Sequence, residues 1–170
     1  LGMYILIREG SATRDLNKLI SEVSKDNLSR ILFCTDDKHP EDLLNEGSID
    51  YNIKLAIEAG IDPIDAITIA SINPAIAYGL KNKGAIAPGY EADLVIIDNF
   101  EDFNIKQVYK KGKLVAENNK ALFDSETILP KSLLDTVNID ENLTLEDLKL
   151  EINGNKVNVI QIIPDSIVTG

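Results

Sequence analysis

Two short apolar runs near the amino terminus, with a helical pattern between them, predict a βαβ unit. Residues 3–7 and 30–34 are rich in β-favouring side chains, and each run ends in polar residues. From about residue 13 to 24, apolar residues recur at helical spacing. Because strand, helix and strand follow one another closely, the two strands should lie parallel and deliver their polar ends to the same side.

The polar residues after these two strands are therefore expected to form one cluster. They are Arg8, Glu9 and Ser11 after the first strand and Asp36, Asp37 and His39 after the second. Ligands of parallel sheets and of α/β barrels bind at the carboxyl ends of the strands. The cluster is thus the place where this sequence predicts chemistry.

Four helices are expected after the second strand. The first begins at Pro40 and ends before Gly47, and the second covers residues 49–59. Asp62 and Pro63 give a capped start to the third, for which Ile64, Ile67 and Ala70 are the predicted core stripe, and a short fourth covers residues 74–79.

From Gly84 the pattern changes from helix to strand. A type II turn at Pro88-Gly89, a strand over 92–98 and a hairpin around Lys111-Gly112 are predicted. A loop-rich connection with at most one short helix follows over 118–148, and Asn153-Gly154 predicts a last hairpin between residues 148–152 and 156–163. We predict an α/β part over 1–82 and a β-rich, sandwich-like domain over 83–170.

Composition narrows the kinds of partner. The chain has 170 residues and a formal net charge of -11, so nucleic acid and anionic membranes are poor partners. No segment reads as a membrane span or a signal peptide, which favours a cytoplasmic protein. The single cysteine, Cys34, excludes an internal disulfide framework and lies within the apolar run, where we expect it in the core.

Asp36 is the best candidate for a catalytic residue. We call the carboxyl ends of the two strands of the βαβ unit, with the polar residues that follow them, the strand mouth. A carboxylate there can bind a metal, orient a water molecule and carry a proton to a leaving group. The alternative is that Asp36 or Asp37 merely caps the helix that starts at Pro40. His39, the only histidine, could orient a carboxylate or touch a substrate, or could simply be an N-terminal helix residue.

Glu9 and Ser11 could position a substrate at the same mouth, or could only solvate the strand end. With one histidine and one cysteine, the chain cannot build a histidine-rich metal centre alone.

Three stretches resemble the carboxyl-terminal part of the amidohydrolase superfamily. They are residues 31–40, the helix with its Asn73-Pro74-Ala75 turn, and residues 84–98 with the order G-x-I-x-P-G-x-x-A-D-L-V. More selectively, Arg8-Glu9-Gly10-Ser11, Thr35 to Pro40 and Glu46 to Tyr51 are similar to the adenine deaminase family.

The resemblance implies that the two strands are the last two of a (β/α)₈ TIM-type barrel and that residues 84 onward belong to a small β domain. It also implies that Ile162-Ile163-Pro164 is the entry to a further C-terminal domain. It implies an enzyme in which one or two divalent metals, manganese first and iron or zinc as alternatives, activate the water that attacks C6 of adenine. Hypoxanthine and ammonia are the products, as in purine salvage. Asp36 would be the metal ligand and proton shuttle, with Glu9, Ser11, Asp37 and His39 on the substrate side or supporting the ligands.

The family's earlier ligands, including a His-x-His pair, have no counterpart in this sequence. We therefore expect a carboxyl-terminal piece of a longer enzyme, inactive alone and unable to hold its metals tightly. Exposed barrel edges favour a homo-oligomer. Two alternatives stay open: another cyclic amidohydrolase, of the dihydroorotase or imidazolone hydrolase type, or a non-catalytic β-rich association domain.

Overall fold

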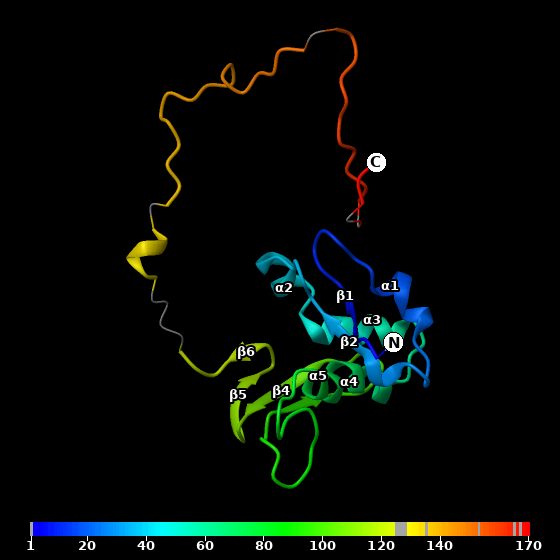
Figure 1. Cartoon of the computed structure of the whole chain (residues 1–170). Helices are drawn as coiled ribbons and strands as arrows, with labels where there is room; N and C mark the ends of the chain where they lie inside the picture. The colour runs from blue at the N-terminus through cyan, green and yellow to red at the C-terminus, as the bar shows by residue number, and fades with distance from the viewer. Residues whose placement is uncertain (1, 125–128, 135, 153, 165, 167) are drawn as a thin grey trace. The chain divides into compact units, whose positions relative to one another are not determined.

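The computed structural model describes residues 2–124, 129–134, 136–152, 154–164, 166 and 168–170. The chain divides into two units, Leu1–Phe123 with Ile162–Gly170, and Asp124–Gln161 (Figure 1). The domain boundary expected at residue 82 falls inside the first unit and stays a prediction. No helix in the described ranges has both the length and the apolar character needed to cross a bilayer.

The predicted βαβ unit is confirmed. Strands β1 (Ile5–Arg8) and β2 (Ile31–Cys34) pair in parallel, with Ile7 opposite Phe33 and Arg8 opposite Cys34. The intervening helix is shorter than the spacing predicts: α1 covers Leu16–Leu19 and continues as a 3₁₀ turn over Ile20–Glu22.

The late start of α1 has a backbone cause. Arg14 forms an isolated antiparallel bridge with Glu9, and the Asp15 N–H donates to the Arg8 carbonyl at 3.2 Å. Arg14 is therefore held against the end of β1 and Asp15 is bonded to it as the N-cap, so the helix begins only at Leu16.

All four helices expected after β2 are present: α2 (Pro40–Asn45), α3 (Ile49–Glu58), α4 (Pro63–Ala70) and α5 (Ile72–Ala77). The core stripe predicted for α4 is wrong at Ile64, which is 57% exposed, whereas Ala66 and Ile69 are fully buried. The small Ala66 side chain lets α4 lie close to α3 and β2, which it contacts.

The core lies between one face of the β1–β2 pair and the helices. From the strands it takes Ile7, Ile31 and Phe33, and from the helical segments it takes Leu16, Ile20, Ile53, Ala56, Ala66 and Ile69. Phe103 joins the same cluster from the loop before β4. Because side chains alternate along a strand, Leu6, Arg8 and Cys34 face away from this core.

A four-stranded antiparallel sheet follows, in the order β3 (Leu94–Ile97), β4 (Ile105–Lys110), β5 (Lys113–Glu117) and β6 (Lys120–Ala121). The hairpin turn is where it was predicted, with positive φ at Lys111 and Gly112. The type II turn is also confirmed, because Gly89 has φ +83° and the Tyr90 N–H donates to the Ala87 carbonyl. In the described part of residues 83–170 this is the one sheet, so the second layer of the predicted sandwich is not found there.

The hairpin predicted between residues 148–152 and 156–163 is wrong for the described part of those ranges. No ladder forms there, and Ile162 makes only an isolated bridge with Thr169. Leu150, Val159 and Ile160 are each more than three-quarters exposed. A two-stranded hairpin is marginal unless its apolar face is covered, and the described residues of the unit Asp124–Gln161 leave these apolar side chains exposed. Asn153, in the expected turn, lies outside the described residues. The one regular segment described in that unit is a 3₁₀ turn over Lys131–Leu133.

Candidate functional site

A cavity of about 560 Å³ opens at the carboxyl ends of β1 and β2. Its lining residues are Leu6, Arg8, Asp15, Leu19, Cys34 and Asp36. Asp36 follows two residues after the end of β2, in a bend where its backbone has φ +51°, and lines the same cavity as Cys34. This is the strand mouth that the sequence predicts as the site.

Asp36 is held at this mouth by an arginine from the neighbouring strand. Arg8 Nη1 donates to Asp36 Oδ2 at 2.5 Å, while Arg8 Nε lies 3.2 Å from Asp15 Oδ2. The hydrogen bond that Arg8 donates to Asp36 is the main cause that raises the pKa of Arg8. Asp36 has φ +51° and a side chain that is 49% exposed, so its carboxylate is accessible as well as fixed.

Asp37 packs against the loop that follows β1. Its Oδ2 accepts from the Ala12 N–H at 2.9 Å, while Oδ1 is buried without a hydrogen-bond partner. A Cβ added at Gly10 would lie 1.7 Å from that same Oδ1 atom, so only glycine fits beside the carboxylate. The capping alternative is wrong for both aspartates, because His39 is the N-cap of α2 and no side-chain bond caps that helix.

Ser11 and His39 are in contact, as expected, but the contact is made by the backbone N–H of His39 and not by its imidazole. The His39 N–H donates to Ser11 Oγ at 2.8 Å, and the Ser11 hydroxyl donates in turn to Asp42 on α2. Ser11 thus fixes the start of α2 to the β1 loop. The His39 residue is exposed, in the N-terminal helix position that the sequence offered as its alternative.

Glu9 is buried, so the interpretation that it only solvates a strand end is wrong. It is 3% exposed, its Oε2 accepts from the Leu16 N–H at 3.4 Å, and Oε1 lies 3.6 Å from Arg14 Nη1. Burial raises the pKa of its carboxyl group.

The prediction that Cys34 lies in the core is wrong: the residue is partly exposed and lines the cavity beside Asp36. Burial raises the pKa of its thiol, which favours the unreactive protonated form.

Sequence reasoning missed two buried polar residues near the mouth. The Lys38 side chain is 1% exposed and donates to Glu46 Oε2 at 2.7 Å. Asn52, fully buried on α3, donates from Nδ2 to the Cys34 carbonyl at 3.1 Å. A signal for Asn52 existed, because an amide in the middle of an apolar helix needs a buried partner.

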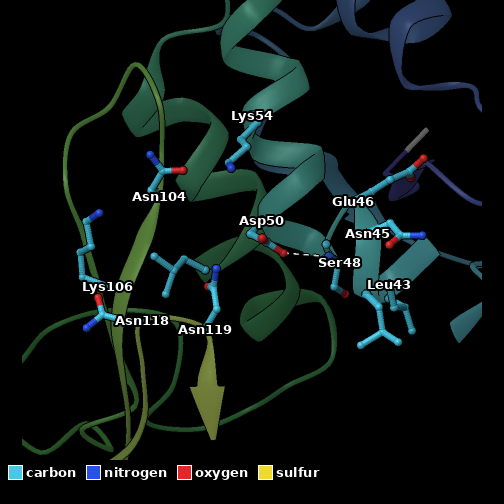
Figure 2. A pocket seen from close by; sticks show the side chains of 13 residues that line it. Leu43, Asn45, Glu46, Ser48, Asp50, Lys54, Asn104, Lys106, Asn118 and Asn119 are labelled. Atoms are coloured by element: carbon cyan, nitrogen blue, oxygen red, sulfur yellow. Dashed lines mark hydrogen bonds between the residues drawn. The ribbon is translucent and has the colours of Figure 1, made fainter. Parts of the chain in front are cut away.

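A second cavity, of about 830 Å³, lies away from the predicted residues. Figure 2 shows Ser48, Asp50 and Lys54 on one side of it and Asn104, Lys106, Asn118 and Asn119 on the other. The Ser48 N–H donates to Asp50 Oδ1 at 2.8 Å within the wall. None of the predicted site residues lines this cavity, so the strand mouth is the better candidate.

The described residues at the strand mouth do not form a complete metal-binding site. Across the residues that the structure describes, no group of three or more His, Cys, Asp or Glu side chains could hold a metal ion. An accessible carboxylate suits a hard or borderline divalent cation, so Asp36 fits as one donor of a larger set.

The chain belongs to the amidohydrolase family, which it matches over residues 8–115. A β-aspartyl dipeptidase from Fervidobacterium islandicum AW-1, solved with a β-Asp-Leu dipeptide, shares the fold with a TM-score of 0.57 at 21% identity, over 73% of this chain and 36% of that one. The barrel-type fold expected from the sequence is supported at this level.

Within the family, the chain is similar to adenine deaminases. It is 49% identical to the "Adenine deaminase" of Petrotoga mobilis and 41% identical to that of Bacillus subtilis, each over 99% of this chain. It spans about 30% of the length of both relatives. The resemblance drawn from the motifs is thereby confirmed.

Proposed function

We propose that this chain supplies part of the active site of a metal-dependent adenine deaminase, which hydrolyses adenine to hypoxanthine and ammonia. One observation carries the proposal: β1 and β2 bring Asp36 and Arg8 together at the mouth of a cavity, in a chain similar over its whole length to adenine deaminases. A carboxylate in that position suits hydrolytic chemistry at a strand mouth.

Asp36 is the residue with two tasks. Its Oδ2 is occupied by Arg8, which leaves Oδ1 for a cation or for a proton in transit to the leaving amine. When bound, a divalent cation would supply the Lewis acidity that activates a water molecule for attack on the carbon that carries the amino group. Histidines outside this chain would complete the donor set.

The neighbouring residues fix this geometry. Asp37, Ser11 and the His39 backbone tie the two strand-end loops together, and Glu9 closes the base of the β1 loop. Under this proposal they act on the substrate side or support the ligands.

The finer assignments belong to the same proposal: manganese as the cation in preference to iron or zinc, purine salvage as the process, the cytoplasm as the location, and a homo-oligomer. Exposed apolar residues on β1, such as Ile5 and Leu6, support association. A monomer by light scattering at high concentration would contradict the oligomer.

The decisive test is Asp36→Asn in the longer polypeptide that carries this chain, assayed for ammonia release from adenine. We expect kcat to fall by at least about 100-fold, since a general acid–base group contributes 10²–10⁴-fold. Asp26→Asn, the same change at an exposed turn residue, is the matched control and should leave kcat unchanged. Near-normal turnover by the Asp36 variant would remove this residue from the mechanism.

A second assay uses the 170-residue chain alone with added manganese, iron or zinc. Because Asp36 is one donor of an incomplete set, we expect ammonia release no faster than in the protein-free blank. Substantial release of ammonia would show that the donor set proposed here is wrong.

A further inference from the structure

Glu46 accepts charged hydrogen bonds from both of the loops that form the strand mouth. Arg14 Nη2, in the loop after β1, donates to Oε1 at 2.9 Å. Lys38 Nζ, in the loop after β2, donates to Oε2 at 2.7 Å. Glu46 itself follows the last residue of α2, and Figure 2 labels it beside Asn45. One carboxylate thus joins three segments, and we call this set of contacts the Glu46 clamp.

The clamp is closed on both sides by further contacts. Lys38 Nζ lies 4.3 Å from the centroid of the Tyr51 ring on α3, a cation–π distance. Arg14 also lies 3.6 Å from buried Glu9. The negative charges of Glu9 and Glu46 therefore balance the positive charges of Arg14 and Lys38. This occurs in a region where the Lys38 side chain is 1% exposed and that of Glu9 is 4% exposed.

A buried ammonium group is tolerated only where a partner compensates for its lost hydration. The clamp therefore fixes the position of Lys38, and with it the backbone of the residues just before it. Those residues are Asp36 and Asp37, and the backbone of Asp36 is in the left-handed region. Buried ion pairs are weak contributors to net stability, so the conformation they impose is the effect to test for.

We propose that Glu46 is a positioning residue: through Lys38 and Arg14 it holds the two strand-end loops in the register that places Asp36 and Asp37 at the mouth. The inference rests on the proposed function, because it assigns Glu46 a part in the same reaction although it touches neither aspartate. Residues that orient catalytic or metal-binding groups from behind typically affect affinity or activity by about 10- to 100-fold.

The test is Glu46→Gln, which keeps the shape of the side chain and removes its charge. In the longer polypeptide we expect kcat for adenine to fall about 10- to 100-fold, with KM changed by less than about threefold. In the 170-residue chain, NMR hydrogen exchange of the Ala12 and His39 amides, which bond across the two loops, should become faster. Glu91→Gln is the matched control, since Glu91 accepts from Lys83 at the same 2.7 Å in the segment before β3. It should match the unmodified protein in both measurements.

A kcat within twofold of the unmodified enzyme would overturn the proposal, whatever the exchange rates. If the unmodified polypeptide does not deaminate adenine, the proposed function fails, and the exchange measurement alone decides on the clamp. Unchanged exchange at both amides would then overturn it. Should Glu46→Gln not fold, Arg14→Gln, at a side chain that is 30% exposed, is the milder variant, with the same criteria.

Discussion

Asn73 in the Asn73-Pro74-Ala75 turn should be a main determinant of stability. Its Nδ2 donates to the carbonyl of Leu28 at 2.7 Å and to that of Ile31 at 2.9 Å, and the residue is 3% exposed. One amide group thus joins α5 to the start of β2. The Asn73→Ala change removes both bonds: the Leu28 carbonyl still accepts from the Ile31 N–H, whereas the Ile31 carbonyl loses its side-chain donor near the core.

The expected cost follows from these two bonds. A net hydrogen bond is worth about 1 kcal/mol, and an acceptor left buried without a partner costs about 1–3 kcal/mol. The Leu28 carbonyl loses one of two donors and the Ile31 carbonyl loses its side-chain donor, so we expect a loss of about 2–4 kcal/mol in the free energy of unfolding. With a urea slope of about 2 kcal/mol per M, the midpoint should fall by about 1–2 M.

The assay is urea unfolding of the 170-residue chain followed by circular dichroism. Asn27→Ala is the matched control, because the Asn27 side chain also makes two bonds to the main chain, donating to the Glu22 carbonyl and accepting from the Ser24 N–H, each at 2.8 Å, but in a partly exposed turn. This control should lose no more than about 1 kcal/mol. A midpoint for Asn73→Ala equal to that of Asn27→Ala would refute the argument from burial.

Three further predictions follow from single contacts. Gly10→Ala should displace the Asp37 carboxylate, because the new methyl group would lie 1.7 Å from Oδ1. We expect the free energy of unfolding in urea to fall by about 1–3 kcal/mol, and an unchanged midpoint would contradict this. Asp62→Ala should cost about 1 kcal/mol by the same assay, since Asp62 caps α4, and a cost equal to that of Asp62→Asn would speak against capping. The side chain of Asn104, with neighbouring backbone amides, lowers the pKa of Asp98 from 3.8 to about 2. Because this folded pKa is depressed, its stabilisation is present above the ordinary pKa and lost as pH falls toward 2; a carboxyl titration by NMR that gives the ordinary value would contradict it.

Local signals predicted most of the fold. The Asp62-Pro63 start of α4 and the Lys111-Gly112 turn are decided by residues next to one another in sequence, so both could be recognised without tertiary information. The parallel pairing of β1 and β2 follows from the connection between them, and this placed Asp36 near Arg8.

Features that depend on distant partners could not be predicted. The burial of Lys38 requires Glu46 and Tyr51, which reach it only once α2 and α3 have packed. The hairpin predicted from Asn153-Gly154 is not found in the described residues around it, for a related reason. The turn residues favour pairing of the two strands, but the pair is stable only when another element covers its apolar face. Neither outcome is encoded in a short window of sequence.

The backbone of Asp36 limits how this position can be redesigned. Its φ of +51° is accepted by glycine, asparagine, aspartate and histidine, whereas β-branched residues are strained there. A threonine or valine at this position would therefore require the loop to be remodelled first. The main chain thus limits which side chains can stand at the mouth, independently of the chemistry that they carry.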